Sequence, residues 1–300
     1  MIRKISFIAG LLLIIGLIGS IITFSSIQRN SDSITTQIDD VPFSHLKVDV
    51  NNVDIELVPS EGEVKIDVSG ANSQELMDGI KIDQQEDTLI IQSNHKRIKW
   101  FSFGFDSSSK IKLFLPEKEY KKVELNSHSG DVYLANITGK DIQTQTRNGD
   151  IVANNISSQL FTVKTTSGDI SLETIKADIH TKTTNGDTTL SNVKAKSIQT
   201  ASGNGDILLK DVSGEIQAEN KNGDFTVKNQ QITDPITAQA RTGDILITAE
   251  NYPENVQFET ASKVGDILIF GKNQQTINNQ NPGILIHLET TVGDIIVKRK

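Results

Sequence analysis

From residue 130 onward, a Gly-Asp dipeptide recurs in this chain at nearly constant spacing. Successive glycines are 19, 19, 18, 19, 18, 20, 22 and 28 residues apart. Periods of about 20 residues and more are typical of architectures that stack one small unit many times. The dipeptides are Gly130-Asp131, Gly149-Asp150, Gly168-Asp169, Gly186-Asp187, Gly205-Asp206, Gly223-Asp224, Gly243-Asp244, Gly265-Asp266 and Gly293-Asp294.

The residues around each dipeptide alternate with the period of a β-strand. The position seven before each glycine is always apolar, and the positions two and four after it are apolar except at Thr188. The position three before it holds Ser, Thr, Asn or Ala. Offsets that differ by two lie on one face of a strand. Each unit is therefore predicted to be two short strands that meet at a glycine corner.

Two strand topologies accommodate such a unit. In a parallel β-solenoid each unit is one coil and equivalent strands stack about 4.8 Å apart, whereas in a meander each Gly-Asp closes an antiparallel hairpin. The solenoid explains why one inward position stays small in every unit, because a narrow interior limits each coil in the same way. We predict an all-β parallel β-solenoid of ~19-residue coils over residues 123–300.

Residues 43–122 continue the pattern in a degenerate form. The same apolar offsets surround Val53-Asp54, which predicts a tenth, divergent unit. Further strands are expected at 64–68, 80–82, 89–91 and 111–115, and we predict that they form a β cap over the end of the core. At the other end, the charges of Lys298-Arg299-Lys300 are expected to discourage edge pairing of the last strand.

An uncharged run from Ile5 to Phe24 follows Arg3 and Lys4. A run of about 20 residues spans a bilayer core, and the basic residues favour a cytoplasmic N-terminus. The prediction is a cytoplasmic tip and single transmembrane helix at 1–27, a linker at 28–42, and a C-terminal domain outside the cell membrane. The alternative is a cleaved signal peptide, because small residues occur at Thr23 and Ser25.

Composition and charge exclude several functions. Without Cys, the chain has no disulfide, zinc ribbon, cysteine nucleophile or lipoprotein attachment site. A formal net charge of −8 argues against a nucleic-acid partner. No cofactor is expected. The five histidines are scattered and indicate no Ser/His/Asp site, so no catalytic residue is predicted. They are His45, His95, His128, His180 and His287.

The predicted ladder of corner aspartates has two interpretations. Stacked carboxylates repel by about 1 kcal/mol per neighbouring pair in water, so something must compensate them. Calcium is one candidate, but calcium-binding β-rolls have two glycine-rich turns per coil and this chain has one. We favour aspartates that accept amide hydrogen bonds at the corner, and expect no metal site. Basic residues two before the glycine are expected to help, namely His128, Arg147, Lys221, Arg241 and Lys263.

An aromatic loop in the cap is the candidate partner contact. It consists of Trp100, Phe101, Phe103 and Phe105 and follows three basic residues. If exposed, it would bind a partner, a glycan or the lipid interface. If buried, it would be a lid on the cap, and the sequence leaves both possibilities open.

The order of an anchor, a divergent strand pair, an aromatic loop and serial Gly-Asp-Ile-x-Leu units resembles the bacterial "putative-adhesin" domain family, which includes the LiaG-like membrane-anchored proteins of envelope-stress operons. The resemblance covers roughly residues 46–300. It implies a non-enzymatic, adhesin-like binding scaffold in the cell envelope, with a glycan or protein as its unknown partner. The alternatives are an accessory or sensory partner of another membrane protein and, more weakly, a carbohydrate-active enzyme. Loop insertions are expected where the last two units depart to Val-Gly-Asp and widen.

Overall fold

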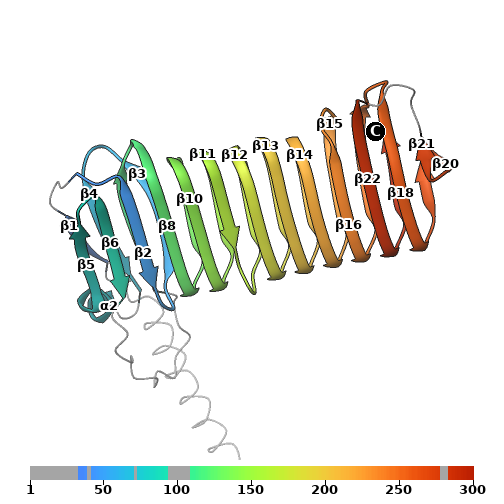
Figure 1. The fold of residues 1–300 in the computed structure, drawn as a ribbon. Coiled ribbons are helices and arrows are strands. Elements are labelled where there is room, and N and C mark those ends of the chain that lie inside the picture. The colour runs from blue at the N-terminus through green and yellow to red at the C-terminus, as the bar shows by residue number, and fades with distance from the viewer. Residues whose placement is uncertain (1–32, 39–41, 71–72, 94–108, 278–282) are drawn as a thin grey trace, which may run out of the picture.

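The computed structural model describes residues 33–38, 42–70, 73–93, 109–277 and 283–300. Within these ranges, 23 strands and one short helix form a straight rod (Figure 1). The predicted membrane span at 5–24 lies outside them. Among the described residues, no helical segment has both the length and the hydropathy of a membrane span.

The Gly-Asp units form stacked coils, which we number 1 to 9 in chain order. In each coil a pre-corner strand and a post-corner strand meet at the Gly-Asp. Neighbouring coils pair in parallel and in register, as in Ile142 with Phe161 and Ile151 with Ile170, so the predicted solenoid is confirmed. The strands of coils 1 to 7 are β8 (Glu119–Ser129), β9 (Val132–Ala135), β10 (Thr138–Asn148), β11 (Ile151–Lys164), β12 (Ile170–Asn185), β13 (Thr188–Asn204), β14 (Ile207–Asn222), β15 (Phe225–Gln231), β16 (Ile236–Thr242) and β17 (Ile245–Asn251). The long strands β11 to β14 each supply the post-corner strand of one coil and the pre-corner strand of the next.

The core lies between the pre-corner and post-corner strands. The apolar residues seven before and two and four after each glycine are buried, as predicted. In coils 1 to 5 the apolar residue seven after the glycine is also buried and fills the second corner. At that corner the preceding residue has a positive φ, which Asn adopts more readily than most residues. Asn136, Asn155 and Asn192 occupy this position, as do Thr174 and Asp211.

Thr188 interrupts the apolar row in the middle of the rod. It is fully buried between Ile170 and Ile207, and its hydroxyl has no hydrogen-bond partner. Thr188→Val keeps the shape and removes the unpaired polar group, so we expect urea unfolding to report a gain of about 1–2 kcal/mol. Thr189→Val, on the outward face, is the control. An equal gain in both variants would contradict this explanation.

At the N-terminal end two more coils extend the rod. Coil A contains β2 (His45–Val50) and β3 (Asp54–Ser60), and it stacks in parallel on coil 1, which confirms the tenth unit. Coil B contains β6 (Thr88–Ser93) and β7 (Lys110–Pro116) and stacks in parallel on the far side of coil A. The residues of coil B were predicted to belong to the β cap, but β6 and β7 form a further coil of the solenoid.

The cover of this end lies outside coil B. In it, β4 (Val64–Ser69) pairs antiparallel with β7, β5 (Ile80–Gln85) with β6, and β1 (Ile34–Ile38) with β4. The helix α2 (Ser73–Gly79) joins β4 to β5. A terminal cover is therefore confirmed. The domain division at residue 122 falls within β8 and stays a prediction.

At the C-terminal end the stacking order departs from the chain order. Coil 8 contains β18 (Val256–Val264) and β19 (Ile267–Ile269), and coil 9 contains β22 (Ile284–Val292) and β23 (Ile295–Arg299). Figure 1 shows β22 between β16 and β18, and β23 pairs with both β17 and β19. Coil 9 is thus inserted between coils 7 and 8.

This insertion corrects one expectation about the end of the rod. The strand β23, which contains Lys298 and Arg299, is internal, so the charges of Lys298-Arg299-Lys300 do not protect a terminal edge. Coil 8 is outermost and is covered antiparallel by β20 (Lys272–Asn273) and β21 (Thr276–Ile277). Loop insertions were predicted in the last two units. Between Gly265 and Gly293 the inserted residues form this cover. The spacing between Gly243 and Gly265 is wider because the chain passes from coil 7 to coil 8 across the place that coil 9 occupies.

Candidate functional site

The corner aspartates form one continuous hydrogen-bonded line, which we call the corner edge. From Asp131 onward, the backbone N–H of each corner aspartate donates to Oδ1 of the aspartate in the adjacent coil nearer the N-terminal end of the rod, as from Asp206 to Asp187 at 2.8 Å. The favoured interpretation is confirmed, except that the amide belongs to the next coil. In spatial order the line is Asp54, Asp131, Asp150, Asp169, Asp187, Asp206, Asp224, Asp244, Asp294 and Asp266.

A second ladder of hydrogen bonds explains why the residue three before each glycine is short. In every coil except coil 7, where Ala240 has no donor, the side chain at this position donates to the carbonyl of the corner residue in an adjacent coil, as from Thr146 Oγ1 to Gly130 at 3.1 Å. Asn220 does the same with its amide, to Gly205 at 3.0 Å. For coil 1 that corner residue is Val53, which accepts from Ser127 Oγ at 3.2 Å. The position is therefore short because it must reach a backbone carbonyl, and hydroxyl groups satisfy that requirement at a buried site.

The charges of the corner edge have little direct compensation. Among the described residues no ion pair joins a corner aspartate to a basic side chain, so the expected help from the basic residues two before the glycine is not seen as ion pairs. The described ranges also hold no group of three or more His, Asp or Glu residues placed to bind a metal ion. The edge is thus a backbone-organising device whose outer oxygens face solvent.

Two substitutions of one corner aspartate separate the effect of its hydrogen bond on stability from the effect of its charge. Asp187→Ala removes the acceptor for the Asp206 N–H, and we expect a loss of about 1 kcal/mol in urea unfolding. Asp187→Asn keeps an acceptor oxygen and removes one of the stacked charges, so it should match or exceed the wild type at low salt. Added NaCl should stabilise the wild type by screening the line. Equal losses in both variants would refute this account.

The outer face of the pre-corner strands carries a regular row of uncharged polar groups, which we call the neutral row. Its members lie six before the glycines of coils 2 to 7, and they pair in register from coil to coil at a strand spacing of about 4.8 Å. The same position is charged in coils 1 and 8, where it holds Glu124 and Glu259. His180 Nδ1 lies 3.2 Å from Gln199 Oε1 within it. The row presents amides, hydroxyls and an imidazole to solvent, and consists of Gln143, Thr162, His180, Gln199, Gln217 and Thr237.

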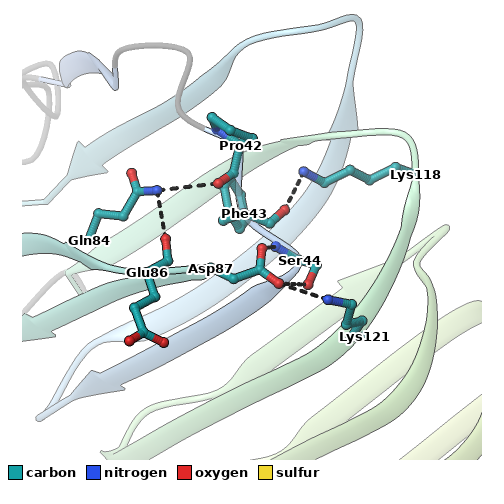
Figure 2. A network of polar contacts seen from close by, with 8 residues as sticks. All are labelled: Pro42, Phe43, Ser44, Gln84, Glu86, Asp87, Lys118 and Lys121. Atoms are coloured by element: carbon teal, nitrogen blue, oxygen red, sulfur yellow. Dashed lines mark hydrogen bonds and ion pairs between the residues drawn. The ribbon is translucent and has the colours of Figure 1, made fainter.

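A polar network fixes the chain where it enters coil A; we call it the entry clamp (Figure 2). Asp87 accepts from the Ser44 N–H at 2.7 Å, from the Ser44 hydroxyl, and from Lys121 Nζ at 2.9 Å. Lys118 Nζ donates to the Phe43 carbonyl at 2.6 Å and lies 4.2 Å from the centre of the Phe43 ring. Sequence analysis missed this clamp, because its members are far apart in the chain and match no motif.

The clamp makes the stability of the fold depend on pH in the acidic range. Hydrogen bonds from Ser44 and Lys121 lower the pKa of Asp87 to about 2. A carboxyl with a lowered pKa stabilises the fold above its unfolded pKa of about 3.9, and this contribution disappears as the pH falls towards 2. We expect the melting temperature of Asp87→Asn to change less than that of the wild type between these pH values. Asp49→Asn, outside the clamp, should behave like the wild type; if it behaves like Asp87→Asn, the assignment is wrong.

A surface hollow of about 520 Å³ lies beside the clamp, at the second corners of the first coils. Pro59, Leu115, Tyr120 and Ile137 give it an apolar floor, and Asn155 lines its edge. The Tyr120 hydroxyl donates to the Pro116 carbonyl at 2.8 Å, and burial raises the pKa of Tyr120. These groups are engaged in the fold and form no nucleophile-and-base pair.

The aromatic loop, Trp100, Phe101, Phe103 and Phe105, lies outside the described residues. Its flanking strands are placed: β6 ends at Ser93 and β7 begins at Lys110, so the loop joins the two strands of coil B. In the chain, the loop therefore stands where coils 1 to 9 have their Gly-Asp dipeptide. Among the histidines, His287 lies 3.5 Å from Glu259, and no described histidine is hydrogen-bonded to both a serine and an aspartate.

Comparisons with known proteins found solved structures that are similar to this chain. A crystal structure of a "putative adhesin" from Bacteroides fragilis is similar over 90% of this chain and 98% of its own, with 17% identity and a TM-score of 0.51. A "putative adhesin" from Parabacteroides distasonis matches 89% of this chain and 97% of its own, at 11% identity and a TM-score of 0.39. No curated protein matches.

The sequence profile of the Toastrack DUF4097 family matches residues 43–203 and again residues 177–298. Two overlapping matches are expected of a chain whose coils are nearly equivalent, because the profile fits the rod in more than one register. The predicted adhesin-type family is confirmed, while the narrower LiaG-like assignment stays a prediction. The solenoid of Gly-Asp coils and the span of both matches place this chain in the Toastrack DUF4097 family.

Proposed function

We propose that this protein is a non-enzymatic, adhesin-like binding scaffold that holds an extended polar ligand, such as a glycan strand of the cell envelope, along its rod. The neutral row carries the proposal. Its hydrogen-bonding groups repeat along a flat sheet face, and long regular faces suit extended ligands. The short corners of coils 1 to 7 support a binding role without catalysis, since the described part has no long insertions there to wall a cleft.

The location is part of the proposal. The uncharged run Ile5–Phe24 behind Arg3 and Lys4 supports a single-pass anchor with the rod outside the cell membrane. Protease added to intact cells should remove the rod while a cytoplasmic marker survives. Protection of the rod in intact cells would refute this orientation. A link to envelope stress would be supported by induction of the protein when the envelope is damaged.

Co-sedimentation with isolated cell-wall glycan tests ligand binding. Gln199→Ala with Gln217→Ala removes two adjacent amides of the neutral row, and we expect a several-fold loss of bound protein with an unchanged melting temperature. Thr189→Ala with Thr226→Ala, on the post-corner face, is the matched control and should bind normally. Equal binding by both double variants, or no binding by the wild type, would refute the proposal.

A second candidate is an accessory or sensory partner of another membrane protein. The strands that flank the aromatic loop in the chain, β6 and β7, favour it, because they lie at the same end of the rod as β1, the first described strand after the predicted anchor. Trp100→Ser with Phe103→Ser should abolish cross-linking to a membrane protein without loss of stability. Val152→Ser, an exposed apolar residue on coil 2, is the control. A large drop in melting temperature would instead support the buried lid.

A further inference from the structure

Coil 9 fills a slot between two coils that precede it in the chain. One side of the slot is the edge of β16 and β17, and the other is the edge of β18 and β19. The pairings on both sides are parallel and share one register, as in Ile236, Ile286 and Phe258. We call this place the exchange slot.

The same contacts hold coil 9 on its two sides. The Asp294 N–H donates to Asp244 Oδ1 at 2.8 Å, and the Asp266 N–H donates to Asp294 Oδ1 at 2.8 Å. Thr290 Oγ1 donates to the Gly243 carbonyl at 3.1 Å, just as Ser262 Oγ donates to the Gly293 carbonyl at 2.9 Å. The slot therefore recognises one kind of occupant, a coil with a short hydroxyl residue three before a Gly-Asp corner.

An empty slot would be costly to leave open. Ile286, Leu288, Ile295 and Val297 of coil 9 are fully buried there, so its departure would expose apolar coil faces on both sides. It would also leave two rows of unpaired backbone groups, which are templates for pairing with another chain. A second copy offers a coil that fits, and reciprocal exchange would restore every contact that each copy lost.

Coil 9 is also joined to the coil before it in the chain by a longer segment than coils 2 to 8 are. The corner glycines of coils 1 to 7 follow one another at 18 to 20 residues, which holds each coil against its neighbours. The glycines of coils 8 and 9 are 28 residues apart. Part of this spacing is β20 and β21, which stay paired with coil 8, so the connection consists of the six residues 278–283 between β21 and β22. Six residues span at most about 20 Å when extended, which lets coil 9 leave its own slot while coil 8 stays in place. Exchange of an identical element is a low-cost route to a dimer.

We infer that the exchange slot is an interaction site for a second copy of this chain, which inserts its own coil 9 and receives the first copy's coil 9 in return. This site is independent of the proposed ligand face, because it is formed by strand edges and not by the neutral row.

Cysteine cross-linking in the full-length chain, which has no native Cys, tests the exchange. Gln239 and Glu289 are exposed register partners on coils 7 and 9. Neighbouring parallel strands place their Cα atoms about 4.8 Å apart, within the range of a disulfide. Copies with only Gln239→Cys are mixed with copies with only Glu289→Cys at high concentration, incubated and then oxidised. A covalent dimer that increases with incubation time is expected.

The matched control uses the same corner offset inside the rod. Lys164 and Lys182 are exposed register partners on coils 3 and 4, and neither coil should exchange. Both double variants within one chain should form internal disulfides, which establishes that the geometry and the fold are sound. If the mixed Gln239→Cys and Glu289→Cys copies give no more dimer than mixed Lys164→Cys and Lys182→Cys copies, the inference is wrong.

A further pair tests whether the slot closes on itself. Gln239 on coil 7 and Ala261 on coil 8 both pair with Glu289, so they are two rungs apart and too distant for a disulfide while coil 9 is in place. Within one chain, Gln239→Cys with Ala261→Cys should stay reduced. An internal disulfide in this variant would mean that coil 8 collapses onto coil 7 and leaves no slot for a partner, which would overturn the inference.

Discussion

Gly186→Ala should destabilise the rod by at least about 4 kcal/mol in urea unfolding, because steric overlap adds to backbone strain. A Cβ at this position would lie 2.0 Å from the carbonyl oxygen of Gly168 in the preceding coil. That oxygen also accepts the Thr183 hydroxyl at 3.2 Å, so it cannot move aside without loss of the second ladder. The φ of Gly186 is +144°, a region that other residues avoid.

Two other glycines separate the causes. Gly62 also has a positive φ, but a Cβ there would meet no atom within 4 Å, so Gly62→Ala should cost only the backbone strain of about 1–3 kcal/mol. Gly79→Ala, with open space and no such φ, should be nearly neutral. If Gly186→Ala costs no more than Gly62→Ala, the corner glycines are retained for conformation and not for the close approach of coils.

Asn229→Leu should cost about 2–4 kcal/mol, because it leaves two buried backbone groups without partners. Asn229 is 3% exposed, and its side chain accepts from the Val212 N–H at 3.1 Å and donates to the Val212 carbonyl at 2.7 Å. Coils 2 to 5 pair backbone to backbone here, as Val193 does with Val212. In coil 6 the chain turns away, and the amide takes the place of the missing strand.

The control for this substitution is Asn148→Leu, which alters an exposed asparagine bonded to Ser129 Oγ at 3.3 Å. Surface changes of this kind are usually within about 0.5 kcal/mol. Urea midpoints and slopes of both variants give the comparison. If Asn229→Leu is as mild as its control, water reaches the Val212 backbone and the amide is dispensable.

The candidate sites differ in the same way as Gly186 and Asn229: some were predictable from the repeated motif, and others depend on contacts between separate coils. The corner edge was anticipated residue by residue, because each rung repeats a short motif. The entry clamp joins Ser44 to Asp87 and Lys121, and the pairing of Asn229 with Val212 likewise joins separate coils. Neither pair has a spacing or composition that distinguishes it from the surrounding polar residues. Such contacts exist only once the coils are stacked.

The sequence by itself determined the parallel solenoid, its inward residues and its glycine corners, because each coil is specified by local alternation that the chain repeats. The tertiary structure alone decided which coil lies beside which. Coil 9 between coils 7 and 8, and coil A between coil B and coil 1, break the chain order at both ends. Coils with the same inward pattern and the same corner offer equivalent edges, so a periodic sequence does not say which edges will meet.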